Sequence, residues 1–231
     1  MELYSLLLML PQEAAADDGL VNMLVQRFNE GGDFMWPVLI SLIVGLAIAF
    51  ERIITLNRAD INTRKFIVTV KGSLEEGGIT SAEEVCANTR GPVASVFQAG
   101  LLRHDEGIEA VEKAIVSYGS IEMSFLERGL VWLSLFISLA PMFGFLGTVV
   151  GMVAAFDAIE KAGDISPSLV ANGIKIALLT TVFGLITAII LQFFYNYVIS
   201  KIDRIVIDME EASIELIDSL VLLHAGRPGS E

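Results

Sequence analysis

Apolar positions in this chain gather in three long uncharged runs that are separated by charged segments. The runs cover residues 34–50, 129–156 and 176–200. Each is near or beyond the roughly 20 residues that an α-helix needs to cross the hydrocarbon core of a bilayer. The pattern therefore predicts three transmembrane helices, over residues 34–56, 129–156 and 168–200.

Charged residues set the orientation of the predicted helices. The formal net charge is -13, yet the mean hydropathy is +0.65, so acidic and apolar residues are strongly segregated. Basic residues such as Arg52, Arg128 and Lys201 flank the spans on one side, whereas residues 157–175 contain only two lysines. The positive-inside rule then places the N-terminus outside the cytoplasm and the C-terminus inside. The acidic excess argues against a nucleic-acid partner, which favours a basic face.

Segments outside the membrane also show helical periodicity. Residues 1–33 are predicted to lie on the outer side, with a short amphipathic helix over Leu20–Phe28 on the membrane surface. Met1–Leu10 is apolar but carries no basic residue, so it is a weak candidate for a secretory signal that ends before residue 17. Residues 157–167 are expected to form a short outer loop, and residues 201–231 a cytoplasmic helix and tail.

Residues 57–128 are predicted to form a cytoplasmic helical domain, which makes the chain an all-α integral membrane protein. Thr80 and Glu83 have the spacing of a capping box, and Pro92 suits the first turn of the next helix. A helix that begins near Ile108 is expected to pass without a break into the second span. Because short helices in a segment of this size make a poor core, we expect them to pack on other copies as well.

Candidate catalytic and metal-binding residues are sparse. Cys86 is the only cysteine, which excludes an intrachain disulfide and favours the role of a small buried hydrophobe. His104 and His224 have no further ligand at metal-binding spacing. The sequence also contains neither a phosphate-binding glycine loop nor a nucleophile elbow. It therefore predicts a protein that is not an enzyme and needs no metal or cofactor.

Small and polar residues line one face of each of the last two predicted spans. In the second span they fall within an arc of roughly 100°, at Ala140, Gly144, Gly147, Thr148, Gly151 and Ala155. In the third they fall within about 80°, at Ala177, Thr181, Gly184, Ala188, Gln192 and Tyr195. One interpretation is helix packing alone, with the threonines bonded to their own backbone carbonyls. The other is that these faces line a pathway.

Three further positions in these spans have a specific expectation. Pro141 is predicted to mark a kink in the packing face, since proline is tolerated in membrane helices. Lys175 is expected to anchor the third span at the interface, or else to contact a partner. Thr180 lies about 100° around the helix from Thr181 and is expected to face a neighbour.

A family resemblance rests on these same residues. The segment from Leu126 to Phe156, with its block APMFGFLGTVVGM, and the segment from Ala177 to Asn196 resemble the ExbB/TolQ/MotA family of proton-channel subunits. Three spans, an outer N-terminus and a domain between the first two spans resemble the ExbB/TolQ branch more than the four-span MotA branch. The resemblance covers about Met35 to Asn196.

The resemblance implies a homopentamer in a bacterial inner membrane, with the N-terminus periplasmic and the C-terminus cytoplasmic. The second and third spans would line a pore around a dimeric partner resembling ExbD or TolR, whose transmembrane aspartate carries the proton. Thr148 and Thr181 fall on the family's pore threonines, and Gln192 and Tyr195 would continue a polar exit. Many relatives have a glutamate where this chain has Ile176, which is a departure from the pattern.

The predicted function is that of a stator subunit that couples the proton motive force to work by a partner complex. ExbB-like energising of TonB-dependent outer-membrane import is the principal expectation, with a TonB-like protein as a further partner. The alternatives are a TolQ-like or gliding-type motor subunit and a non-conducting membrane scaffold. Sodium is the alternative ion, because threonine hydroxyls do not distinguish it from the proton.

Overall fold

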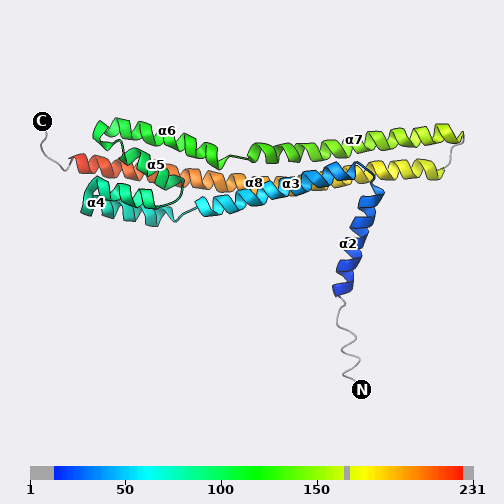
Figure 1. Ribbon diagram of the computed structural model, residues 1–231, viewed down its shortest axis with the longest axis horizontal. Helices are drawn as coiled ribbons and strands as arrows, with labels where there is room; N and C mark the ends of the chain where they lie inside the picture. Colours follow the sequence, from blue (N-terminus) through cyan, green and yellow to red (C-terminus); the bar gives the residue numbers. More distant parts are fainter. Residues whose placement is uncertain (1–12, 164–166, 226–231) are drawn as a thin grey trace, which may run out of the picture. The chain divides into compact units, whose positions relative to one another are not determined.

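The computed structural model describes residues 13–163 and 167–225 (Figure 1). The regular structure of these residues is helical. In chain order the elements are α2 (Glu13–Glu30), α3 (Met35–Ala59), α4 (Thr63–Asn88), α5 (Pro92–Leu101), the 3-10 helix η1 (His104–Glu106), α6 (Ile108–Leu126), α7 (Leu130–Ala162) and α8 (Pro167–Ala225). The proposed signal at Met1–Leu10 and the tail beyond Ala225 lie outside the described residues.

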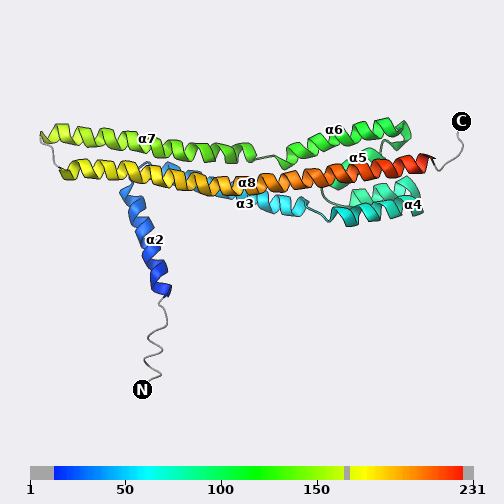
Figure 2. The ribbon, with the colours of Figure 1, turned by 180° about the vertical axis from the view of Figure 1, so that it is seen from behind.

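The chain divides into two compact units. Unit 1 consists of Met1–Gly45 and Leu135–Gln192, and unit 2 consists of Leu46–Ser134 and Phe193–Glu231. In unit 1, α7 runs alongside the first part of α8, as the front and back views both show (Figures 1 and 2). In unit 2, α4, α5 and α6 surround the last part of α8.

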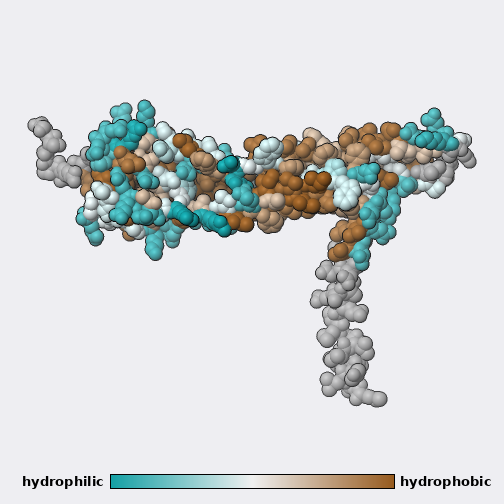
Figure 3. Space-filling view, viewed as in Figure 1, coloured by the Kyte–Doolittle hydropathy of each residue, from teal (hydrophilic) through white to brown (hydrophobic). Residues whose placement is uncertain are grey.

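Three helical segments are long and apolar enough to cross a membrane, as the sequence predicts. They lie within Met35–Asn88, Ile108–Lys161 and Val170–Leu223. Only 22%, 22% and 28% of their most apolar windows are buried within the chain. A helix that is apolar all round and exposed in its own chain must meet lipid or other subunits. The apolar side chains are brown in the space-filling view, whereas hydrophilic side chains gather over α4 and α6 (Figure 3).

The core of unit 2 joins α8 to the helices that precede α7. The rings of Phe66 of α4 and Phe97 of α5 pack at a tilt of 48° with centroids 5.4 Å apart, and Leu216 of α8 is buried in the same cluster. Cys86 also belongs to this cluster and is 2% exposed, which confirms its predicted role as a buried hydrophobe. A second cluster joins α3 to α8 through Leu56 and neighbours. The helical domain therefore needs α8 to complete its core.

Two boundaries differ from the sequence prediction. The helix that begins at Ile108 does not continue into the second span, because Gly129 has a φ of 87° and ends the helical path between α6 and α7. Only glycine adopts such a left-handed conformation at little cost. The segment expected to form a loop over residues 157–167 is helical as far as Ala162. A kink at Gly78, with φ 70° and ψ -166°, divides α4 just before Thr80.

Helices α7 and α8 are both longer than the spans predicted from the sequence. Pro141 lies inside α7, where the helix continues on both sides of it. The third predicted span and the C-terminal helix form one uninterrupted helix of 59 residues, from Pro167 to Ala225.

Candidate functional site

Helices α7 and α8 approach each other so closely that their backbones touch. A methyl group built on Gly184 would lie 2.7 Å from the carbonyl oxygen of Ala140, and one built on Gly144 would lie 2.9 Å from that of Thr180. Neither distance leaves room for a side chain. Small residues permit this kind of approach between membrane helices, where no hydrophobic force drives association.

The close approach continues along both helices. A methyl group on Gly147 would lie 2.6 Å from the hydroxyl oxygen of Thr180, and one on Gly151 would lie 3.3 Å from the carbonyl oxygen of Gly173. A methyl group on Gly173 would contact Ala155. We call these five glycines the glycine interface: Gly144, Gly147, Gly151, Gly173 and Gly184. It positions the threonines of both helices.

The hydroxyl groups of three threonines bond to backbone carbonyls. Thr181 Oγ1 donates across the interface to the carbonyl oxygen of Gly144 at 3.2 Å and lies 3.4 Å from that of Ala177 in its own helix. Thr148 donates to the carbonyl oxygen of Phe145. Thr148 and Thr181 are half-buried, whereas Thr180 is fully buried and donates to Ala177 at 2.8 Å. Each hydroxyl keeps lone pairs that can accept a further hydrogen bond.

Tyr195 lines a hollow in unit 2 with a volume of about 410 Å³. Glu127, Ser134 and Asp203 contribute polar groups to its wall, and Leu130 is among its apolar lining residues. The hollow lies between the start of α7 and α8. Two carboxylates and a phenol therefore surround a space large enough for water.

The remaining predicted residues have simpler surroundings. Gln192 is an exposed residue of unit 1, whereas Tyr195 belongs to unit 2. Pro141 is half-buried within α7. Ile176 is half-buried, and its methyl group Cγ2 lies 3.6 Å from where a side chain on Gly32 would begin.

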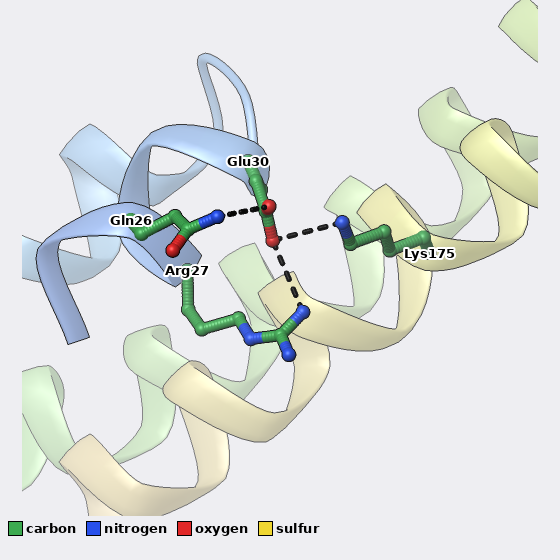
Figure 4. A network of polar contacts seen from close by, with 4 residues as sticks. All are labelled: Gln26, Arg27, Glu30 and Lys175. Carbon is green, nitrogen blue, oxygen red and sulfur yellow. Dashed lines mark hydrogen bonds and ion pairs between the residues drawn. The ribbon is translucent and has the colours of Figure 1, made fainter. Parts of the chain in front are cut away.

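Lys175 pairs with the end of α2 (Figure 4). Its Nζ lies 2.9 Å from Oε2 of Glu30, and Arg27 Nη1 lies 3.1 Å from the same oxygen. Gln26 Nε2 donates to the other carboxylate oxygen at 3.3 Å. The hydrogen bond from Lys175, with the positive charges of Lys175 and Arg27, holds the pKa of Glu30 below its ordinary value despite partial desolvation. The structure thus gives Lys175 a partner within its own chain.

Sequence reasoning missed three features of α8 in unit 1. Gly173 and Thr187 are buried, and Leu191 fills the space beside Gly45 of α3. Together with Ala177, Thr180 and Gly184 they recur at alternating steps of four and three residues. This is the repeat by which two helices keep one face in contact, and it was present in the sequence.

Comparison with known proteins identifies the family. A family model described as the MotA/TolQ/ExbB proton channel family matches residues 88–211. The chain belongs to this family. The match covers the glycine interface and Thr148, Thr180 and Thr181.

Individual relatives carry transport names. The chain is 33% identical over 180 residues to an ExbB homologue from Methanothermobacter thermautotrophicus, covering 78% of this chain and 64% of that protein. It is 30% identical over 182 residues to the biopolymer transport protein ExbB-like 1 from Synechocystis, covering 77% and 71%. Over 84 residues it is 34% identical to the Tol-Pal system protein TolQ from Haemophilus influenzae, covering 36% and 37%.

Family and structure together establish the class of protein. It is a membrane protein of a proton-channel family whose members include biopolymer transport proteins. Three long apolar helices and the family assign it to the inner membrane. The family comprises channel subunits that energise transport and work with partner proteins.

Proposed function

We propose that this chain is the proton-channel subunit of a stator that couples the proton motive force to mechanical work of a partner complex. The observation that carries the proposal is the glycine interface, which holds Thr148 and Thr181 half-buried on two membrane-spanning helices. Five copies would arrange α7 and α8 around a pore. An ExbD/TolR-like dimer with a transmembrane aspartate would occupy that pore.

The threonine hydroxyls suit proton transfer by a partner carboxyl group. A hydroxyl can accept a hydrogen bond from the protonated carboxyl and donate one to the ionised form. This offsets part of the cost of charge at membrane depth. Each proton that crosses supplies about 2.3 kcal/mol per 100 mV of membrane potential.

The hollow beside Tyr195 is the proposed cytoplasmic exit of the pathway. Glu127 and Asp203 on its wall would accept protons and pass them to water, and Gln192 would lie earlier on the route. This assignment requires the N-terminus to be periplasmic and the C-terminus cytoplasmic, as the basic residues around Arg52 and Lys201 favour.

ExbB-like energising of TonB-dependent import is the proposed process, because two of the three relatives named above are named as a homologue of ExbB or as ExbB-like. A TolQ-like function is the second candidate, since the chain also matches TolQ over 84 residues. A non-conducting scaffold is the third. It is favoured by one observation, that Thr148, Thr180 and Thr181 all donate to backbone carbonyls.

Proton influx into liposomes that contain this protein and an ExbD/TolR-like partner tests the proposal. Thr148→Val and Thr181→Val remove one hydroxyl each and nearly keep the shape of the side chain. Thr180→Val is the matched control, since its hydroxyl is buried in the glycine interface. Native mass spectrometry measures assembly of every variant.

We expect influx that depends on the partner and is lost in Thr148→Val and Thr181→Val while the complex stays intact. Thr180→Val is expected to conduct like the wild type. Influx of sodium in place of protons would make sodium the transported ion and would leave the proposed pathway unchanged. Equal conduction by all three variants would refute the role of the threonines, and an absence of influx of either ion would favour the scaffold.

A further inference from the structure

An apolar groove runs between α6 and α8 of unit 2, outside the region assigned to ion flow. Its volume is about 550 Å³. Ile115 and Met209 form a buried floor, and Val116 and Ile214 form walls that are 73% and 62% exposed. Gly119 keeps the groove open, because it has no side chain to fill it. We call it the α6–α8 groove.

The rims of the α6–α8 groove are acidic. Glu112 of α6 and Glu210 of α8 line it and are exposed. Neither carboxylate takes part in an ion pair among the residues that the structure describes. An apolar floor between two unpaired negative charges fits a partner surface with an apolar centre and positive flanks.

The chain carries such a surface on another of its helices. Val68 of α4 is 70% exposed, and Arg64 and Lys65 lie one helical turn before it on the same side. Both basic residues are exposed, and within the described part of the chain no ion pair occupies them. We call these three residues the α4 patch.

The α6–α8 groove and the α4 patch are different surfaces of one chain. A contact between two different surfaces repeats from copy to copy and generates a ring when the rotation closes. We propose that the α6–α8 groove of one subunit receives the α4 patch of the next subunit. The inference rests on the proposed function, which requires a ring of copies, and adds the surfaces that would join them.

In this contact Val68 enters the groove beside Val116 and Ile214. Arg64 and Lys65 then face Glu112 and Glu210 of the neighbouring copy. Burial of the three exposed apolar side chains supplies the main favourable term. The charge pairs set the register and disfavour contact between identical surfaces.

Cross-linking between two differently tagged full-length chains in membranes tests the contact. One chain carries Val68→Cys and the other Val116→Cys, so that only a contact between copies gives a product. The control replaces Val116→Cys by Leu222→Cys, since Leu222 is also 73% exposed but lies outside the groove. The native Cys86 is buried and does not interfere.

We expect a Val68–Val116 product and at most a trace of the Val68–Leu222 product. Joint Glu112→Lys and Glu210→Lys replacement should weaken association about tenfold, and so should Arg64→Glu with Lys65→Glu. Combining the two reversed sets should restore the product. Equal yields for both cysteine pairs, or no rescue, would overturn the proposal.

The outcome is distinguishable from failure of the proposed channel. Influx that persists without the Val68–Val116 product would mean that the ring forms through other surfaces. The expected product without influx would leave the contact standing and refute the channel. Gly119→Leu supplies a second check, because a side chain there fills the groove from within and should abolish the product.

Discussion

Glu30 and Lys175 form an ion pair of 2.9 Å that joins the end of α2 to the first turns of α8. The two residues are 145 positions apart in the sequence. Glu30 precedes the first predicted span, and Lys175 lies near the start of the third. The pair accounts for a lysine that the sequence alone assigned to the membrane interface or to a partner. It also ties the last residue of α2 to α8.

Attachment of α2 should depend on pH through Glu30. Its pKa is lowered by the hydrogen bond from Lys175 and by nearby positive charge. The docked state, in which Glu30 of α2 is paired with Lys175 of α8, therefore favours the ionised carboxylate. The resulting stabilisation is present above the pKa of a free glutamate, about 4.3. It is lost as the pH falls through the lower pKa of the docked state.

A spin label at Val25→Cys, an exposed position on α2, measures this attachment. Label mobility should rise in acid, and Glu30→Gln should show the higher mobility already at pH 7. Asp33→Asn is the control, because this nearby exposed carboxylate takes part in no ion pair among the described residues. Unchanged mobility in Glu30→Gln would show that the pair does not hold α2.

Gly184→Ala should destabilise the pair of helices α7 and α8. The added methyl group would lie 2.7 Å from the backbone oxygen of Ala140, which cannot rotate away. Overpacking of this kind costs about 1–3 kcal/mol, which thermal unfolding in detergent can detect. Gly72→Ala is the control, since a methyl group there meets nothing within 4 Å and should stabilise α4 slightly. Equal unfolding temperatures would contradict the glycine interface.

Cys86 should resist thiol reagents in the folded protein. Burial raises the pKa of its thiol to about 12, with a smaller contribution from the charge of Glu83. The reactive thiolate is therefore scarce at pH 8. We expect maleimide labelling only after unfolding, whereas Val68→Cys should label at once. Rapid native labelling of Cys86 would mean that the core of unit 2 opens readily.

Gly129→Ala should weaken the turn between α6 and α7. A methyl group at this position would meet only ordinary contacts, the nearest 3.6 Å away at Arg52, so the cost comes from the backbone. A side chain at φ 87° costs roughly 1–2 kcal/mol. Gly119→Ala lies within a regular helix and should not be destabilising. Similar unfolding temperatures for Gly129→Ala and the wild type would show that the turn relaxes freely.

Much of the architecture follows from local patterns in the sequence. Three uncharged runs are sufficient to predict three membrane-spanning helices, because the length and the absence of charge are local properties. Pro92 begins α5 as predicted, since proline at a first turn loses no hydrogen bond. Cys86 is buried because it shares the apolar period of its helix.

Features that depend on a partner surface were harder to predict. On α8 two adjacent stripes contain small residues, one through Thr180 and Thr187 and the other through Thr181 and Ala188. Helical periodicity is consistent with burial of either stripe. Only the contact with α7 shows that the stripe through Thr180 and Thr187 is the buried one. The break at Gly129 is likewise invisible to periodicity, because the apolar pattern continues across it. The ion pair of Lys175 with Glu30 depends on a long-range contact that no local pattern encodes.

Pro141 has a consequence for the backbone hydrogen bonding of α7 within the membrane. Because proline has no N–H, α7 cannot supply the usual donor to the carbonyl oxygen of Ile137, four residues earlier. A bare carbonyl is costly in hydrocarbon. That oxygen therefore needs a hydrogen-bond donor from water or from another part of the protein. It lies in the same helix as Thr148. A single missing N–H group thus leaves the bilayer-spanning part of α7 with one backbone oxygen whose hydrogen bond must come from a donor other than residue 141.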